Sequence, residues 1–428
     1  MPVSDHPHLF EIGGENYHTD FLAWDYVRGS EDDPWHTYPD DTAIGTPLKR
    51  ARPGTWFAQR NNSPLVLQRA YDTSRTFLRD ENDFPGPRTM QAAATWLQGA
   101  ALHHDRFLLF VDEFDPHEPF DVAEQWVNRY DPDWDDDQII WPPYDVGAIA
   151  QGRLSQREGH HIRANYGAKL TMIDHWFGRM LDTLDSNAMW ADTAVIVCTD
   201  HGHYLGDIRD GKDLWGKPGV PQYEPLGHTP LLIHWPGNPG GGEHNALTTN
   251  VDLFATLADI FDVTPWHITH GRSLVPLLAG SATHVRDWAV GGVYGNWVQI
   301  TDGTRKYARG ASGTNYPLSM WSNRWTTMPV YALPGLRLPR PDHRAVIDFM
   351  PGSSVPVLRQ PFEPGDPLPM WVGRNCVDAH YCFDLTVDPD ERENRRGTST
   401  ERDLIELLRV ALHDLQVPAE QLVRLGLS

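Results

Sequence analysis

The chain has 428 residues, which is long enough for one large domain with a smaller appendage. Its 58 acidic and 36 basic residues give a formal net charge of −22, which disfavours nucleic acid and anionic membrane surfaces as partners. A site for an anionic substrate must therefore be a local basic pocket. The sequence shows no stretch typical of a signal peptide and no apolar run of about 18 residues, so we expect no membrane span.

The first 88 residues are polar and rich in Pro, Gly and Trp, and they predict loops with short elements. The opening MPVSDHPHLFEIGG offers neither a leader nor a first strand, which suggests a start inside a domain. Regular patterns follow. Apolar residues at spacings of three and four predict helices at Thr89–His104, His161–Leu184 and Val251–Phe261, the last capped by Asn250.

Short apolar runs alternate with these helices. They predict buried strands at Arg106–Phe114, Thr193–Asp200 and Thr229–Gly237. Strands that alternate with helices favour an α/β fold with a mainly parallel sheet. After about residue 285 the pattern changes to short β-like pieces and a closing helix near Asp403–Leu415. We therefore expect a larger α/β domain over residues 1–284 and a β-plus-helix subdomain over residues 285–428.

Asp200-His201-Gly202 lies where the second predicted strand ends. Open α/β sheets bind ligands beyond the carboxyl ends of their strands, so these side chains stand where a site is expected. The carboxylate suits Ca²⁺ or Mg²⁺, and the imidazole suits Mn²⁺ or Zn²⁺. The alternative is an ordinary turn in which Asp200 and His201 are solvated.

Five further residues are candidates for binding an oxyanion. His117 follows the first predicted strand, and Lys217 and His228 bracket the loop before the third strand. Lysine in a Gly- and Pro-rich loop is a flexible point charge that suits a tetrahedral anion. His6 and His8 alternate at the start of the chain and would reach one pocket across a turn. For each of them the alternative is a surface side chain without a ligand.

No nucleophile is evident among these residues. Cys198 lies in an apolar strand, where a thiol is expected to be buried and inert. No serine occupies a G-x-S-x-G turn, and no P-loop is present. The acidic stretch Asp131–Asp137 lacks the glycine and the distal glutamate of an EF-hand loop, so we interpret it as a solvated loop.

Taken in order, these segments resemble the sulfatase family of the alkaline phosphatase superfamily. FLLFVDEFDPHEPF is similar to the family strand and its H-x-P histidine, and DTAVIVCTDHG is similar to the strand that ends in the metal pair. LWGKP and HTPLLIHWPG follow in the family order. FDLTVDPDERENRRG (Phe383–Gly397) resembles the closing signature. The resemblance covers essentially the whole chain.

The resemblance implies a metal-dependent hydrolase of sulfate esters whose nucleophile is a formylglycine. It assigns Asp200 and His201 to the metal, for which calcium is the first choice and manganese or magnesium are alternatives. It assigns His117 and Lys217 to the sulfate group. The expected partner is a small anionic ester.

DHPHLFE resembles the family segment G-K-x-H-L-G, so that His8 matches the active-site histidine and His6 replaces a lysine. His8 or His228 would assist proton transfer. His201 in place of the commoner asparagine, together with the missing lysine, also resembles the relatives that cleave phosphonate monoesters and phosphodiesters. That activity is the alternative to sulfate ester hydrolysis.

The chain departs from the family pattern in what should precede it. A first strand with paired aspartates and a C-x-P-x-R motif, whose cysteine becomes formylglycine, have no counterpart in these 428 residues. We therefore expect a truncated sequence, weak metal affinity and poor sulfate ester hydrolysis. An unpaired sheet edge would lower solubility or favour a homo-oligomer. A non-catalytic anion-binding protein is the third hypothesis, and a cytoplasmic location is favoured over others.

Overall fold

The computed structural model describes residues 1–10, 16–31, 33–36, 48, 51–52, 66–238, 241–325, 338–369, 372 and 379–428. These residues form two compact units that interleave along the chain. Unit 1 contains Met1–Ala191 and Tyr204–Gly216, and unit 2 contains Asp192–His203, Lys217–Trp325 and Pro339–Ser428. This division does not follow the domain boundary that we expected after residue 284. That boundary stays a prediction.

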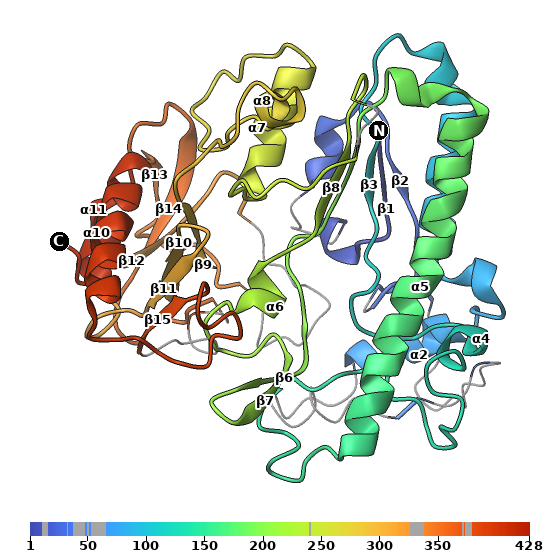
Figure 1. Cartoon of the computed structure of the whole chain (residues 1–428), viewed down its shortest axis with the longest axis horizontal. Coiled ribbons are helices and arrows are strands. Elements are labelled where there is room, and N and C mark those ends of the chain that lie inside the picture. The colour runs from blue at the N-terminus through green and yellow to red at the C-terminus, as the bar shows by residue number, and fades with distance from the viewer. Residues whose placement is uncertain are drawn as a thin grey trace. The chain divides into compact units, whose positions relative to one another are not determined.

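The parallel sheet of unit 1 is built around the first residues of the chain (Figure 1). Strand β1 (Pro2–Ser4) pairs in parallel with β2 (Asp25–Tyr26) on one side and with β3 (Phe110–Asp112) on the other. Val3 is fully buried, and the amino group of Met1 donates a hydrogen bond of 2.6 Å to the carbonyl of Leu108. The expectation that the opening residues hold no strand is therefore wrong.

Two helices of unit 1, α3 (Pro85–Gln98) and α5 (Gln156–Ser186), pack against each other. Ser155 and Glu158 start α5 with a capping box, in which each side chain accepts a hydrogen bond from the other residue's backbone N–H. The apolar spacing then places Met172 and Trp176 in a core shared with α3. Both predicted helices are confirmed, and α3 begins earlier, at a proline that suits the first turn.

A second sheet of unit 1 is antiparallel. Strand β7 (Lys212–Gly216) pairs with β6 (Tyr204–Arg209) and with β4 (Asp145–Val146). Asp210 and Gly211, both with positive φ, make the two-residue turn between β6 and β7. The other short elements of unit 1 are η1 (Pro7–Leu9), η2 (Tyr17–Asp20), α2 (Val66–Arg75), η3 (Glu81–Asp83), η4 (Ala100–His103), α4 (Glu124–Val127) and η5 (Met189–Ala191).

Unit 2 holds the other two predicted strands as a two-stranded ladder. Strand β5 (Val195–Cys198) pairs with β8 (Leu231–His234), and the pairing is antiparallel. The connection between them contains a hairpin and the short helix α6 (Glu224–Gly227) in place of a helical crossover, so the chain returns in the opposite direction. The parallel arrangement expected for these two strands is thus wrong, although the α/β class is confirmed.

Helix α7 (Val251–Ile260) follows β8 as predicted, and α8 (Val275–Leu278) comes after it. Asn250 stands at the N-cap position of α7, but its side chain makes no cap hydrogen bond. Its amide instead donates to the carbonyls of Thr199 and Asp200, each at 3.1 Å. Asn250 therefore does not cap α7 through its side chain but holds the turn after β5 through these two hydrogen bonds.

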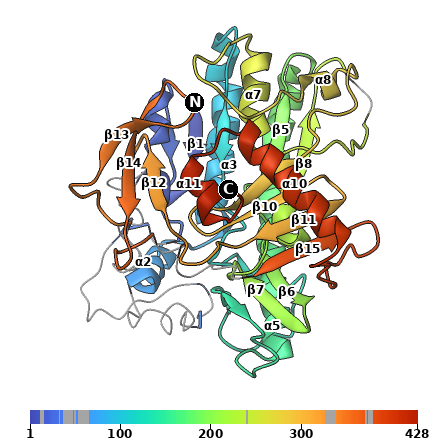
Figure 2. The ribbon, with the colours of Figure 1, turned by 90° about the vertical axis from the view of Figure 1, so that its left-hand side faces the viewer.

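The rest of unit 2 contains two antiparallel sheets and two helices (Figure 2). The first sheet has the order β15-β11-β10-β9, and α10 packs on it through Leu404 and Leu408, which contact Ile300 and Tyr307. The second sheet has the order β12-β14-β13. The bounds are β9 (Ala289–Val293), β10 (Trp297–Thr301), β11 (Arg305–Arg309), β12 (Leu318–Ser322), β13 (Val346–Phe349), β14 (Pro356–Phe362), β15 (His380–Asp384), α10 (Ser399–Asp414) and α11 (Ala419–Arg424).

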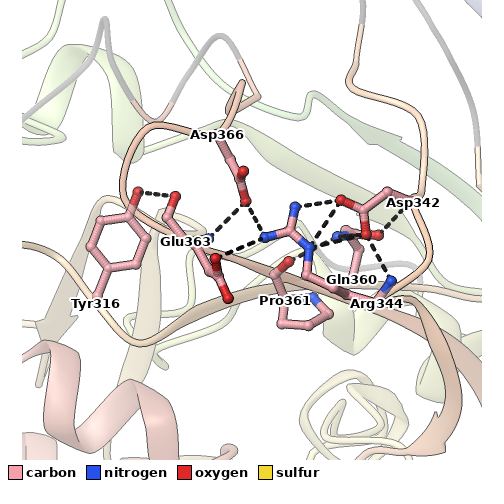
Figure 3. Close-up of polar contacts among 7 residues, drawn as sticks. All are labelled: Tyr316, Asp342, Arg344, Gln360, Pro361, Glu363 and Asp366. Carbon is pink, nitrogen blue, oxygen red and sulfur yellow. Dashed lines mark hydrogen bonds and ion pairs between the residues drawn. The ribbon is translucent and has the colours of Figure 1, made fainter.

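Arg344 fastens the loop before β13 to the end of β14 (Figure 3). Its Nε donates to both carboxylate oxygens of Asp342, and its Nη1 forms an ion pair with Asp366 at 2.7 Å. Gln360 of β14 also donates to Asp342, at 3.1 Å. The neighbouring guanidinium holds the pKa of Asp342 below its usual value.

No described helix has both the length and the hydrophobicity that crossing a bilayer requires.

The stability of unit 1 should depend on pH through His161, a fully buried residue of α5. Burial lowers its pKa to about 4, and the hydrogen bond of 2.9 Å with Asp131 only partly offsets burial. Between pH 6.5, the usual pKa of histidine, and about pH 4, His161 binds a proton in the unfolded chain but not in the folded chain. The free energy of unfolding should therefore fall as pH decreases, by up to about 1.4 kcal/mol per pH unit.

Denaturant unfolding of the wild type and of His161→Gln at pH 7 and pH 5 measures this effect. The wild type should lose more stability than His161→Gln on acidification. An exposed control, His284→Gln, should behave as the wild type does. Equal losses in wild type and His161→Gln would contradict the assignment.

Candidate functional site

The pairing of β1 with β3 places the residues that follow each strand side by side. His6 and His8 come after β1, and Phe114 and His117 come after β3. The ring of Phe114 lies 4.8 Å from that of His6 and stacks on that of His117 at 4.3 Å. The rings of His6 and His8 are 5.6 Å apart. The structure thus gathers three predicted site residues, His6, His8 and His117, in what we call the histidine cluster.

Each of these imidazoles has a carboxylate nearby, and His117 Nδ1 lies 3.6 Å from that of Glu118. His6 Nδ1 lies 3.5 Å from Asp112, and His8 Nε2 lies 3.3 Å from Glu31. Burial alone would raise the pKa of Glu31, but the hydrogen bond from His8 and the charges of His117 and His8 hold that pKa below its usual value. Sequence reasoning missed Glu31. This residue lies in an irregular segment, and no sequence pattern shows that its side chain contacts the residues after β1.

The loop that carries His117 is fixed by a buried lysine. Lys169 of α5 donates to the carbonyls of His117 and Pro119 at 3.0 and 2.7 Å and pairs with Asp115. His117 Nδ1 lies 2.8 Å from the carbonyl of Glu118. A carbonyl only accepts hydrogen bonds, so Nδ1 carries the proton and the ring has a defined tautomer. The one signal for Lys169 in the sequence is its position on the apolar side of a helix.

Three carboxyl groups belong to the segments that carry the histidine cluster, of which Asp5 is fully buried and Glu113 and Asp115 are partly buried. Burial, together with the neighbouring charge of Asp115, raises the pKa of Asp5 to about 8. Burial also raises the pKa values of Glu113 and Asp115, although Lys169 opposes both shifts. Asp5 accepts hydrogen bonds from the Phe114 N–H at 2.8 Å and from the hydroxyl of Ser30 at 3.1 Å. Asp5 therefore holds both chain segments of the cluster in place.

Asp5 should make stability depend on pH with the opposite sign to His161. Between its usual value of 3.8 and about 8, the folded chain holds a proton that the unfolded chain releases. The free energy of unfolding should therefore fall as pH rises, on the order of 1 kcal/mol per pH unit from this group. Asp5→Asn keeps the acceptor for Phe114 and removes the charge, so it should be more stable than the wild type at pH 8.

Chemical denaturation at pH 5.5 and pH 8 tests this expectation. The exposed residue Asp25 of β2 provides a matched control, and Asp25→Asn should leave the pH dependence unchanged. A loss of stability in Asp5→Asn that is the same at both pH values would show that the carboxylate is ionised throughout.

Asp200 and His201 lie together in unit 2. His201 Nε2 is 3.2 Å from the carboxylate of Asp200, and the His201 N–H donates to the same carboxylate at 2.8 Å. The Asp200 side chain is 79% exposed, and His201 is 35% exposed. His201 Nδ1 lies 2.9 Å from the carbonyl of Gly202. This is the turn after β5 that Asn250 tethers.

The same turn is joined to α6. The Gly202 N–H donates to the carbonyl of Leu226 at 2.9 Å. A Cβ at position 202 would lie only 2.0 Å from the carbonyl oxygen of Pro225, so only glycine allows this approach. The turn that carries Asp200 therefore lies beside the helix that leads to His228.

His228 is positioned by a chain of charged side chains. Its Nδ1 lies 2.9 Å from Glu224, which also accepts a hydrogen bond of 2.9 Å from Lys306. Lys306 is buried and pairs with Glu391 at 2.7 Å, and Glu391 accepts a hydrogen bond from the Glu224 N–H. Burial raises the pKa of Glu391 against the opposing charge of Lys306. Sequence reasoning singled out His228 and the closing motif but not this link.

Lys217 directly follows β7 and is half-buried, at the start of a segment of unit 2. Cys198, expected to be buried, is exposed at the end of β5. Partial burial and the charge of Asp200 raise the pKa of its thiol, which keeps it protonated at neutral pH. The expectation of a buried thiol was wrong, but Cys198 is still a poor nucleophile.

Asp200 and His201 alone do not fit a tightly held calcium ion. They offer two side chains that contact each other, whereas Ca²⁺ takes six to eight oxygen ligands. Within the described ranges, no group of three or more His, Cys, Asp and Glu side chains is placed to hold a metal ion. The two residues would supply at most part of a metal site.

The approach of Gly202 to α6 gives a test of how the Asp200 turn is held. Gly202→Ala should push the turn away from Pro225 and cost about 1–3 kcal/mol of stability, the usual penalty for overpacking. Gly241 has open space around its Cα, so Gly241→Ala is the matched control and should cost little. Thermal unfolding compares the two variants, and equal stability would show that the turn is not confined by α6.

Comparison with known proteins shows the family of the chain. The sulfatase family model matches residues 34–263, more than half of the chain. The chain is 34% identical over 218 residues to the choline-sulfatase of Rhizobium meliloti, a match that covers 45% of this chain and 40% of that protein. It is 24% identical over 340 residues to arylsulfatase K of Xenopus laevis, covering 74% and 53%. The chain belongs to the sulfatase family, and its matches span about half or less of these relatives.

Solved structures show the same fold. The phosphonate monoester hydrolase of Agrobacterium radiobacter aligns with a TM-score of 0.54 at 15% identity, covering 97% of this chain and 78% of that one. A putative sulfatase of Bacteroides fragilis aligns with a TM-score of 0.53 at 16% identity, covering 80% and 62%. The α/β fold of the alkaline phosphatase superfamily is therefore confirmed.

Proposed function

We propose that this chain acts on sulfate esters as a sulfatase-type hydrolase, with His117 and Lys217 contacting the oxygens of the sulfate group. The supporting observation is the family match over residues 34–263, which includes both of these residues as well as Asp200, His201 and His228. Because the matches span about half of the relatives, the activity and its substrate are proposals.

The chemistry of the histidine cluster supports binding of an anion. His8 faces the buried carboxylate of Glu31, which favours the protonated imidazole. His117 has its Nδ1 proton committed to a carbonyl, so its orientation is fixed before a ligand arrives. A charge-assisted hydrogen bond to a sulfate oxygen is worth about 1.5–3 kcal/mol. Such contacts would hold the ester without a large rearrangement.

Proton transfer to the leaving group is proposed for His8 or His228. Both imidazoles have a carboxylate partner on one ring nitrogen, Glu31 for His8 and Glu224 for His228. A carboxylate in this position orients an imidazole, which suits a general acid or base. The His228 side chain is 79% exposed, so its ring is open to solvent.

The proposal makes separate predictions for binding and for turnover. Calorimetric titration with 4-nitrophenyl sulfate should show binding that inorganic sulfate competes away. His117→Ala and Lys217→Met should each weaken binding about tenfold, the effect of losing about 1.4 kcal/mol. Release of 4-nitrophenol should be slow, because Asp200 and His201 supply few donors for a metal and the raised pKa values of the Cys198 and Cys382 thiols make both poor nucleophiles.

Two exposed residues give matched controls for this experiment. His284→Ala and Lys212→Met change the same residue types elsewhere and should bind the ester as the wild type does. The assigned contacts would be refuted if both His117→Ala and Lys217→Met bound the ester as tightly as the wild type. Tighter binding and faster cleavage of phenyl phosphonate esters would favour the alternative activity, hydrolysis of phosphonate monoesters and phosphodiesters. His6 and His201 are the residues in the sequence that suggest this alternative. Binding with no turnover of either ester would favour an anion-binding protein.

A further inference from the structure

The carbonyl groups of three successive residues after β3 each have a fixed partner. Those of His117 and Pro119 accept hydrogen bonds from Lys169 Nζ, at 3.0 and 2.7 Å. The carbonyl between them, that of Glu118, lies 2.8 Å from His117 Nδ1. By holding the backbone on both sides of Glu118, Lys169 determines where this carbonyl stands. The carbonyl of Glu118 in turn holds the His117 ring.

Lys169 lies where it can hold this backbone rigidly. It belongs to the middle of α5, a helix of 31 residues, and is only 5% exposed. An ammonium group has three N–H donors, and here they face three acceptors, the two carbonyls and the carboxylate of Asp115. Lys169 therefore acts on a ligand through the residues that it holds or through its charge, and not by contact.

The orientation of His117 is the quantity that such a support controls. A hydrogen bond weakens steeply when its angle falls below about 120°, so a rotated ring loses most of its bond to a sulfate oxygen. The charge of Lys169 is a weaker means of attracting an anion, because the carboxylate of Asp115 balances it at short range. The hydrogen bonds to the two carbonyls are thus the contribution that the ion pair alone does not provide.

We infer that Lys169 is a positioning residue of the proposed sulfate site, which holds the His117 ring in the orientation that binds the anion. This inference rests on the proposed function, because it needs the contact between His117 and the sulfate group. It extends that site to the interior of α5, at a residue 52 positions away from His117 in the sequence.

A double-mutant cycle tests this role by calorimetric titration with 4-nitrophenyl sulfate. Lys169→Met should weaken binding at least fivefold, although residue 169 does not contact the ester. In the His117→Ala background the same change should weaken binding less than twofold, because the ring that Lys169 orients is gone. A purely structural effect of Lys169 would weaken binding by the same factor in both backgrounds.

The double variant Asp115→Asn/Lys169→Met separates the carbonyl contacts from the charge. Lys169→Met alone leaves Asp115 without its ion-pair partner, which lowers stability. The double variant removes both charges, so it should melt at a higher temperature than Lys169→Met. Its binding of the ester should stay as weak as that of Lys169→Met, because the carbonyls of His117 and Pro119 still lack their donor.

Two controls cover stability and residue type. Met172 lies on the same helix, close to one turn after Lys169, and is fully buried in the core of unit 1. Met172→Ala should therefore lower the melting temperature without changing the Kd. Lys212→Met replaces an exposed lysine and should change neither quantity.

The His117 ring also reports on Lys169 when no ester is present. Nitrogen-15 NMR of histidine-labelled protein at pH 8.5 distinguishes the two neutral tautomers, and His117→Ala identifies the signals of this ring. The wild type and Met172→Ala should carry the proton on Nδ1, where the carbonyl of Glu118 accepts it. Lys169→Met should show a mixture of both tautomers, because that carbonyl is no longer held.

The inference is overturned if Lys169→Met leaves the Kd or the His117 tautomer as in the wild type. It is also overturned if the loss of binding is the same in the His117→Ala background, or if Asp115→Asn/Lys169→Met regains the wild-type Kd. The double variant carries the comparison if Lys169→Met does not fold. Failure of the proposed function has a different signature: the wild type then binds no 4-nitrophenyl sulfate, while the tautomer still shows whether Lys169 orients His117.

Discussion

The pairing of β1 with β3 is the constraint on which unit 1 depends. Three residues of each strand are enough to align the segments that follow, because the register Ser4 to Asp112 places the next residues of both chains at the same edge. Asp5 then bonds the backbone of Phe114, and the stacked rings continue that alignment outward to His117. A parallel pair with long connections is held in register by such side-chain contacts rather than by strand length.

Periodicity in the sequence predicts the long elements of this fold well. The spacing of apolar residues locates α3, α5 and α10, because each buries apolar side chains in a core. It also locates α7, although the buried residues of that helix are Asp252 and Thr256. It cannot supply strand direction. The apolar runs of β5 and β8 are compatible with either orientation, and only the connection between them decides that they are antiparallel. A strand as short as β1 is also invisible, since three residues carry no period.

The sequence indicates candidate site residues that belong to recognisable motifs, but not the residues that support them. His6, His8 and His117 flank motifs, so the sequence indicates them and the structure brings them together. Lys169 and Glu31, by contrast, reach the cluster from a helix and from an irregular segment. Their importance comes from burial and partner geometry, which are long-range properties that a motif does not encode.

The link from Glu391 through Lys306 to Glu224 changes how the closing motif of the family is understood. Glu391 and Glu224 are 167 positions apart, yet one buried ammonium group, that of Lys306, pairs with both. Neutralising either acid would leave the other to balance Lys306 alone, so the two positions should evolve together. The C-terminal signature would then supply a negative charge that shares Lys306 with the distant segment carrying Glu224. Its sequence would vary together with that segment across relatives.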